Sequence, residues 1–142
     1  MNVESGDLNL LDLPSPTANR IAGFSWSSNG KLLLDRESDS ATDRWLHTVD
    51  PVDGRLREIW HDHRETRVYT SIASAWHSDG ERVGFLSDLN DRYGLYLLTP
   101  GEDSPNLLTN KSFDVTGAPL ISVSANAIIT GPFNEGEAHI TA

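Results

Sequence analysis

Short apolar runs alternate with polar turn residues along nearly the whole chain. Alternation of apolar and polar residues over about four to eight positions, bounded by Gly, Pro, Asn or Asp, is typical of antiparallel strands. No window of about 11 residues has the apolar spacing of an amphipathic helix. We therefore predict an all-β protein with strands at residues 21–26, 31–36, 44–49, 56–60, 69–76, 82–87, 93–99 and 106–109, after an apolar run at Leu8–Leu13.

One segment of this pattern occurs twice. The stretch Phe24–Leu34 returns as Ser74–Phe85, and each copy contains a tryptophan, an Asn-Gly or Asp-Gly turn and an apolar run in the same order. The two tryptophans, Trp26 and Trp76, thus occupy the same place in each copy. A third and shorter copy begins near Pro119 and stops at its third strand. Repeats of about 40 to 50 residues with four short antiparallel strands are typical of β-propeller blades.

The predicted fold is therefore a partial β-propeller, a single domain over residues 1–142. It is built of about three four-stranded antiparallel blades, at residues 20–64, 68–112 and 115–142. Natural propellers close a ring of about four to eight blades, which leaves only short exposed edges. A shorter arc exposes apolar blade faces. We therefore expect the chain either to be a piece of a longer protein or to assemble with other copies.

The aromatic residues are predicted to belong to the core. Trp26 and Trp76 recur at the repeat spacing, so we expect both to pack between blades rather than to form a ligand cage. Tyr69, Tyr93 and Tyr96 are expected to share that role, each with its hydroxyl near the edge of a blade.

Charge and composition exclude several classes of function. A net charge of −10 disfavours binding to a nucleic-acid backbone or to an anionic membrane surface. The chain has no cysteine, which excludes disulfides, thiolate zinc sites and cysteine nucleophiles. No apolar stretch approaches the roughly 18 residues of a membrane-spanning helix. The N-terminus lacks the basic start and apolar core of a signal peptide, which favours the cytoplasm.

The residues that follow the turns resemble a known family. Ser87–Tyr96 and the closing Leu107-Leu108-Thr109 look like the TolB-type propeller repeat. Within that class, Trp26–Gly30 followed by Leu46–Gly54 resembles the N-terminal propeller of dipeptidyl peptidase IV-like members of the prolyl oligopeptidase family. Leu108–Val115 resembles the junction that follows such a blade. The resemblance covers about residues 8–141.

The resemblance implies that the propeller caps an α/β-hydrolase domain, filters peptides by size and contacts the N-terminus of the substrate, as propellers of that family do. This chain has no Gly-x-Ser-x-Gly nucleophile motif and no Glu-Glu pair, so no catalytic residue is carried over. The implied function is the non-catalytic propeller portion of a serine peptidase that acts in proteolysis. The alternative is a TolB-like propeller that serves as a protein–protein interaction module. A third hypothesis is that the chain is a fragment without independent function.

The implied partners are a peptide substrate or a protein, together with a hydrolase domain, further blades or other copies of the chain. Neither nucleic acid nor a membrane is expected, and no cofactor is predicted.

One candidate metal cluster lies near the end of the first repeat, where His61, His63 and Glu65 are close in sequence. Histidines at positions i and i+2 share one face of a strand and, with a carboxylate, could bind zinc. Such sites normally need a third well-placed ligand, and Arg64 lies within the cluster. A polar loop between blades is therefore preferred, and no metal site is predicted.

Two other polar clusters are interpreted as turns. Asp88, Asn90 and Asp91 resemble the start of a calcium loop, but the EF-hand spacing fails and a hairpin turn is preferred. The adjacent residues His77, Ser78 and Asp79 are rejected as a catalytic triad because triad members converge from distant parts of a chain.

Three arginines are the candidates for contact with a substrate or partner: Arg64, Arg67 and Arg92. In an acidic chain they could face a carboxylate. The competing interpretation is that they form weak surface pairs with neighbouring Asp and Glu residues.

Overall fold

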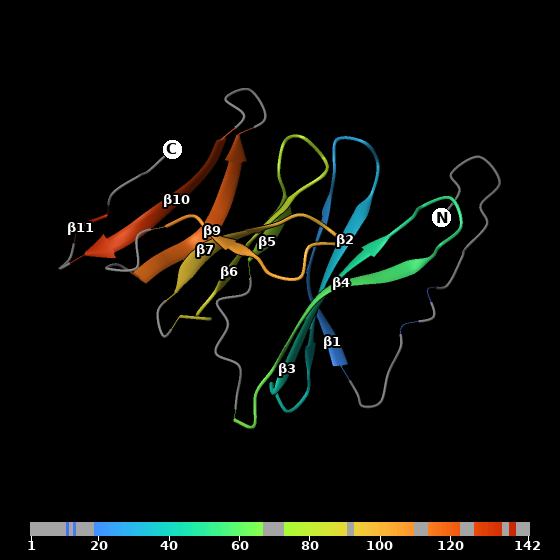
Figure 1. The fold of residues 1–142 in the computed structure, drawn as a ribbon, viewed down its shortest axis with the longest axis horizontal. Helices are drawn as coiled ribbons and strands as arrows, with labels where there is room; N and C mark the ends of the chain where they lie inside the picture. The colour runs from blue at the N-terminus through green and yellow to red at the C-terminus, as the bar shows by residue number, and fades with distance from the viewer. Residues whose placement is uncertain are drawn as a thin grey trace.

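The computed structural model describes residues 11, 13, 19–66, 73–90, 93–109, 114–122, 127–134 and 137–138, with side chains only up to residue 109. The first sheet contains four antiparallel strands in the order β1-β2-β3-β4 (Figure 1): β1 (Asn19–Trp26), β2 (Leu32–Ser38), β3 (Asp43–Val49) and β4 (Leu56–His63). The second has the same order: β5 (Ser74–Trp76), β6 (Val83–Ser87), β7 (Gly94–Leu98) and β8 (Asn106–Leu107). These strands confirm the predicted all-β fold.

The third sheet has three strands in the order β11-β10-β9: β9 (Asp114–Ser122), β10 (Ala127–Asn134) and β11 (Glu137–Ala138). Its first strand begins before Pro119, where the third repeat was predicted to start. The blade boundaries given above stay predictions. Of the apolar run Leu8–Leu13, only Leu11 and Leu13 are among the described residues, and neither lies in a strand. Within the described part of the chain, no helix is long and apolar enough to cross a membrane.

The repeated turns lie against each other. Gly30 and Gly80 adopt φ angles of 83° and 69°, a region that favours glycine over residues with a Cβ. Asn29 Nδ2 donates to the carbonyl oxygen of Gly80 at 3.2 Å, and Ser28 Oγ donates to that of Ser78 at 3.3 Å. Lys31 completes the contact with an ion pair to Glu81 at 3.0 Å. The predicted turns therefore also join the two blades.

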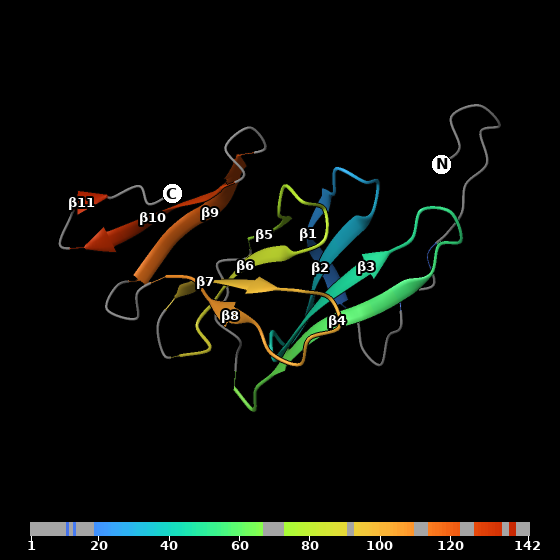
Figure 2. The same cartoon turned by 45° about the horizontal axis from the view of Figure 1, so that its top comes forward.

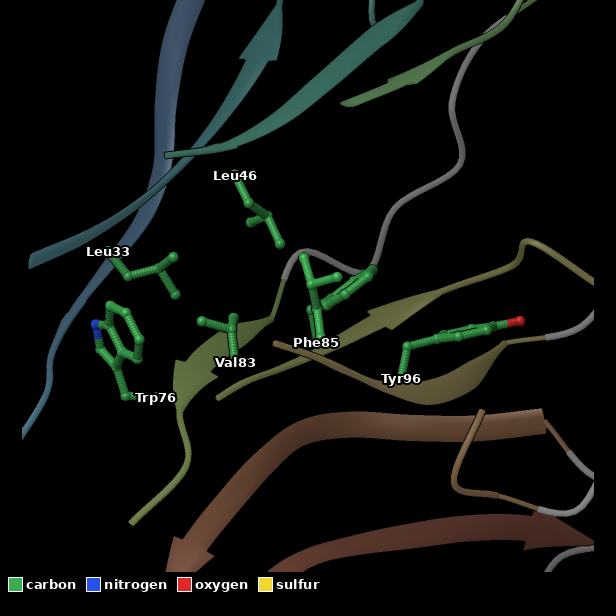
Figure 3. Packing of buried hydrophobic residues seen from close by; sticks show 7 residues of the cluster. Leu33, Leu46, Trp76, Val83, Phe85 and Tyr96 are labelled. Carbon is green, nitrogen blue, oxygen red and sulfur yellow. The ribbon is translucent and has the colours of Figure 1, made fainter. Parts of the chain in front are cut away.

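The main core lies between the first and second sheets. Figure 3 shows Leu33 and Leu46 of the first sheet facing side chains of the second, which comprise Trp76, Val83, Phe85 and Tyr96, and Leu98 belongs to the same buried cluster. Leu86 and Leu95 form a smaller cluster with Ala73. The β9 strand contacts β5, β6 and β7, so the three sheets lie side by side, as the two views in Figures 1 and 2 show.

The repeated tryptophans have different surroundings. Trp76 is buried, with 4% of its surface exposed, as predicted. Trp26 was predicted to be buried in the same way, and this was wrong, since 58% of it is exposed. The reason is that successive side chains of a strand point to opposite faces. Ser25 faces the second sheet, as the hydrogen bond that its Oγ accepts from the backbone N–H of Trp76 at 3.2 Å shows. Its neighbours Phe24 and Trp26 therefore face away from the second sheet.

Among the tyrosines, Tyr96 is buried in the main core and accepts a hydrogen bond at its hydroxyl from Asn90 Nδ2 at 2.8 Å. Burial raises the pKa of this hydroxyl against the opposing effect of the Asn90 hydrogen bond. Tyr93 is half-buried, and Tyr69 lies outside the described residues. The predicted core role is thus confirmed for Tyr96.

A buried ion pair within the first sheet also contacts the second. Arg44 Nε and Nη2 donate to the two carboxylate oxygens of Asp35 at 2.9 and 2.7 Å, and neither side chain is exposed. Arg44 Nη1 donates to the carbonyl oxygen of Leu86 in the second sheet at 2.6 Å. The guanidinium carbon also lies 5.8 Å from the ring centres of Trp60 and Phe85. Arg44 therefore fixes the second sheet against the first.

Candidate functional site

The strand directions place the connections of the first two sheets at two opposite ends. Residues 27–31, 50–55 and 77–82 connect strands at one end, which we call the tight-turn end. Residues 39–42, 64–66 and 88–90 follow strands at the other, which we call the linker end. Candidate polar side chains gather at the linker end, whereas the tight-turn end holds a cavity.

Arg64 lies at the linker end, directly after β4. Its Nη2 is 2.7 Å from Asp88 Oδ1 and 3.0 Å from Asp62 Oδ2, and the side chain is mostly buried. Burial works to lower the pKa of Arg64, but the hydrogen bonds to Asp88 and Asp62 outweigh it and raise the pKa. Because Asp88 belongs to the second repeat, Arg64 joins two blades. A role in binding a partner stays a prediction, and Arg67 and Arg92 lie outside the described residues.

The two clusters interpreted as turns are occupied by internal contacts. Asp88 accepts hydrogen bonds from Arg64, and Asp91 lies outside the described residues. Asp79 accepts hydrogen bonds from the backbone N–H groups of Glu81 and Arg82 at 2.9 and 3.0 Å. Burial would raise the pKa of Asp79, yet these bonds hold it well below its usual value. Asp79 therefore stabilises its turn.

The two histidines considered above as metal ligands lie in a strand. The preferred interpretation placed His61 and His63 in a loop, and this was wrong, because β4 continues through His63. The pairing of His61 with Trp45 and of His63 with Asp43 in β3 extends the strand. Both histidines share one face, as their spacing indicated.

Asp43 is the residue that sequence reasoning missed. Its Oδ1 lies 2.9 Å from His61 Nε2 and 2.7 Å from His63 Nδ1. Burial works to raise the pKa of Asp43, but hydrogen bonds from His61, His63 and Thr42 hold it below its usual value. The carboxylate is thus ionised at neutral pH. Two imidazoles and a carboxylate converge here from neighbouring strands.

The strand register explains why sequence reasoning missed Asp43. It faces His63 across the β3–β4 hairpin, but a bulge lies between Leu46 and His47 in the pairing. Counting back from the turn without the bulge pairs Asp43 with Asp62 instead. The bulge shifts this pairing by one residue and brings His63 opposite Asp43.

His47 is a buried histidine on the same strand as Asp43. Burial, followed by the charges of Arg36 and His61, lowers the pKa of His47 to about 4. Its Nε2 lies 4.0 Å from a carboxylate oxygen of Glu58, and its Nδ1 has no hydrogen-bond partner. His47 is therefore neutral at pH 7 and forms no charged pair there.

The tight-turn end contains a cavity of about 430 Å³ between the first and second sheets. Its size falls within the range of about 300–1,000 Å³ that is usual for ligand pockets. Charged side chains dominate its lining, among them Lys31, Arg57 and Glu81. The lining favours a polar ligand over an apolar one.

No family model and no curated protein sequence matches the chain. Solved structures do resemble it. A protein assigned as a dipeptidyl aminopeptidase IV from Bacteroides ovatus ATCC 8483 superposes with a TM-score of 0.78 at 13% identity, over 98% of this chain and 23% of that one. Proteins assigned as TolB from Agrobacterium tumefaciens and Acinetobacter baumannii give TM-scores of 0.63 and 0.65 at 15% and 17% identity. Each covers 84% of this chain.

The chain folds as β-propeller blades. The predicted resemblance to TolB and dipeptidyl peptidase IV-like propellers is therefore confirmed for the fold. The chain spans 23% to 40% of the length of these structures. At such low identity the comparison concerns architecture alone.

Proposed function

We propose that this chain is the non-catalytic propeller portion of a dipeptidyl peptidase IV-like serine peptidase, where it restricts access to the active site and contacts the peptide substrate. The observation that supports this proposal is the superposition on the Bacteroides ovatus protein. It extends over 98% of the chain with a TM-score of 0.78, whereas the TolB structures match 84% at 0.63 and 0.65. The third sheet thus also finds a counterpart in the peptidase-like structure.

The chemistry of this chain fits a role in access and contact. It contains no Gly-x-Ser-x-Gly motif that could supply a nucleophile. Under the proposal, Arg64, Arg67 and Arg92 contact substrate carboxylates, and a hydrolase domain elsewhere in the longer protein cleaves the peptide bond. The contacts of Arg64 with Asp62 and Asp88 would then orient its guanidinium toward the substrate.

The test begins with the coding sequence on both sides of residues 1–142. The proposal expects a downstream Gly-x-Ser-x-Gly motif followed by an aspartate and a histidine. The product of the whole reading frame should then cleave X-Pro or X-Ala dipeptide reporters, and replacement of the motif serine by alanine should abolish cleavage. A reading frame that encodes only further blades would overturn the proposal.

The arginine role is tested in that same full-length product. Arg64→Gln should raise KM for the reporter more than it lowers kcat, because a substrate contact is lost. Arg82→Gln is the matched control, since the Arg82 side chain is 40% exposed at the opposite, tight-turn end, does not line the cavity there, and should leave KM unchanged. Equal effects of the two substitutions would remove Arg64 from the proposed contact surface.

The second candidate function is a TolB-like propeller that binds protein partners. Two of the three superposed structures are TolB proteins, and both are slightly more similar in sequence, at 15% and 17% identity against 13%. A reading frame with further blades and no hydrolase would favour it. Its product should be inactive on dipeptide reporters.

A further inference from the structure

We propose that Asp43, His61 and His63 form a binding site for a divalent transition-metal ion of the zinc type. Asp43 Oδ1 lies 2.9 Å from His61 Nε2 and 2.7 Å from His63 Nδ1. The ligand atoms of all three residues lie within 4.8 Å of one another. The third ligand that the sequence did not reveal is therefore Asp43. This proposal stands on these residues alone and does not depend on the proposed function.

The donor set suits zinc. Imidazole nitrogen and carboxylate oxygen bind Zn²⁺ at about 2.0–2.2 Å, commonly with tetrahedral geometry. Tetrahedral ligand atoms at such bond lengths lie roughly 3.3 Å from one another. The two nitrogen–oxygen distances here are a few tenths of an ångström shorter than that. A small outward movement of the three side chains would admit the ion.

Neighbouring groups orient two of the ligands. Thr42 Oγ1 donates to Asp43 Oδ2 at 2.8 Å, which leaves Oδ1 for the two histidines. The ring of His61 stacks on that of Trp45, with centres 5.2 Å apart and planes 15° from parallel. Such supporting contacts fix ligand geometry in metal sites. The ligands also stand on paired strands, which hold their spacing.

Access and charge are also suitable. The side chains of His61 and His63 are 37% and 62% exposed, so an ion can enter from solvent and keep water as a fourth ligand. Arg64, the cation whose position in the sequence argued against a metal site, pairs with Asp62 and Asp88. The carboxylate of Asp43 is thus left to the two histidines and Thr42.

The experiment measures Zn²⁺ binding to the 142-residue chain by isothermal titration calorimetry at pH 7.5. This pH is about one unit above the ordinary pKa of histidine. We expect one ion per chain. His63→Gln and Asp43→Asn should each weaken binding by at least about tenfold, since loss of even a supporting residue costs about 10- to 100-fold. Glu65→Gln is the matched control, an exposed carboxylate of the same segment, and should bind as the unaltered chain does.

A second measurement tests coordination directly. Co²⁺ bound in place of zinc should give the intense visible absorption of a tetrahedral site, and His63→Gln should remove it. Far-UV circular dichroism establishes that each variant is folded. The proposal is overturned if no saturable Zn²⁺ binding occurs up to about 1 mM, the concentration at which affinity is marginal. Equal loss of affinity in Glu65→Gln and His63→Gln would overturn it as well.

Discussion

The two repeated tryptophans allow a matched test of how the blades hold together. Trp26 and Trp76 have the same place in their repeats, but only Trp76 packs against the neighbouring blade. We expect Trp76→Ala to destabilise the chain far more than Trp26→Ala. The comparison controls for residue type and position in the strand, so the difference reports burial between blades.

The magnitude follows from the buried area. A buried aromatic side chain removes about 150–250 Å² from water, which at about 25 cal/mol per Å² corresponds to about 4–6 kcal/mol. Truncation of a buried tryptophan to alanine typically costs about 3–5 kcal/mol, which we expect for Trp76. Trp26 is 58% exposed, so less than half of that buried area is lost on truncation, and the cost should not exceed about 2.5 kcal/mol.

The assay is urea unfolding followed by far-UV circular dichroism, with the midpoint and slope compared between variants. Several protein concentrations should be used, because association through the exposed Trp26 would make the midpoint depend on concentration. If Trp76→Ala does not fold, Trp76→Phe should show an intermediate loss. Equal losses at the two positions, or a larger loss at Trp26, would refute the assignment of the core to the joint between the two blades.

Three further predictions concern pH, charge and assembly. The pKa of His47 is about 4 in the folded chain and about 6.5 in the unfolded chain, so the free energy of unfolding should fall by at most about 3 kcal/mol as pH drops from 6.5 to 4. Urea midpoints measured in the presence of a chelator should show this fall, and His47→Gln should reduce the dependence of the midpoint on pH. Asp35→Asn should cost about 3–5 kcal/mol in urea unfolding, since it leaves Arg44 buried without its carboxylate, and a thermal midpoint unchanged by the substitution would contradict this. Light scattering should give a mass above 15.6 kDa, because Phe24 and Trp26 expose an apolar face, and Trp26→Glu should shift the chain toward a sharp monomer peak.

The sequence predicted those features that depend on local chemistry. Turns with Asn-Gly and Asp-Gly were located correctly because Gly30 and Gly80 provide the positive φ angles that these turns need. The strands were located by alternation of apolar and polar residues. Neither feature requires knowledge of which residues meet across the fold.

The features that failed depend on contacts between distant residues. Burial of a tryptophan depends on which face of its sheet meets a neighbour, and the repeat pattern is the same for Trp26 and Trp76. The convergence of Asp43 and His63 depends on a one-residue bulge, and the sequence around Leu46 and His47 has no glycine or proline to mark it. These features could be known only once the strands were paired in space.

The contact of Arg44 with the Leu86 carbonyl oxygen has a consequence for the order of the repeats. Leu86 occupies in β6 the place that Asp35 occupies in β2, since each lies three residues beyond the partner of the repeated tryptophan. The second blade thus has a leucine where the first has the carboxylate that neutralises Arg44. The two blades share a backbone plan but are not interchangeable. Because Asp35 and Arg44 both belong to the first blade, they would move together, but a first blade taken alone leaves Arg44 Nη1 without the Leu86 carbonyl oxygen. The pair, rather than the single blade, is therefore the smallest unit of this chain that keeps the hydrogen bonds of Arg44.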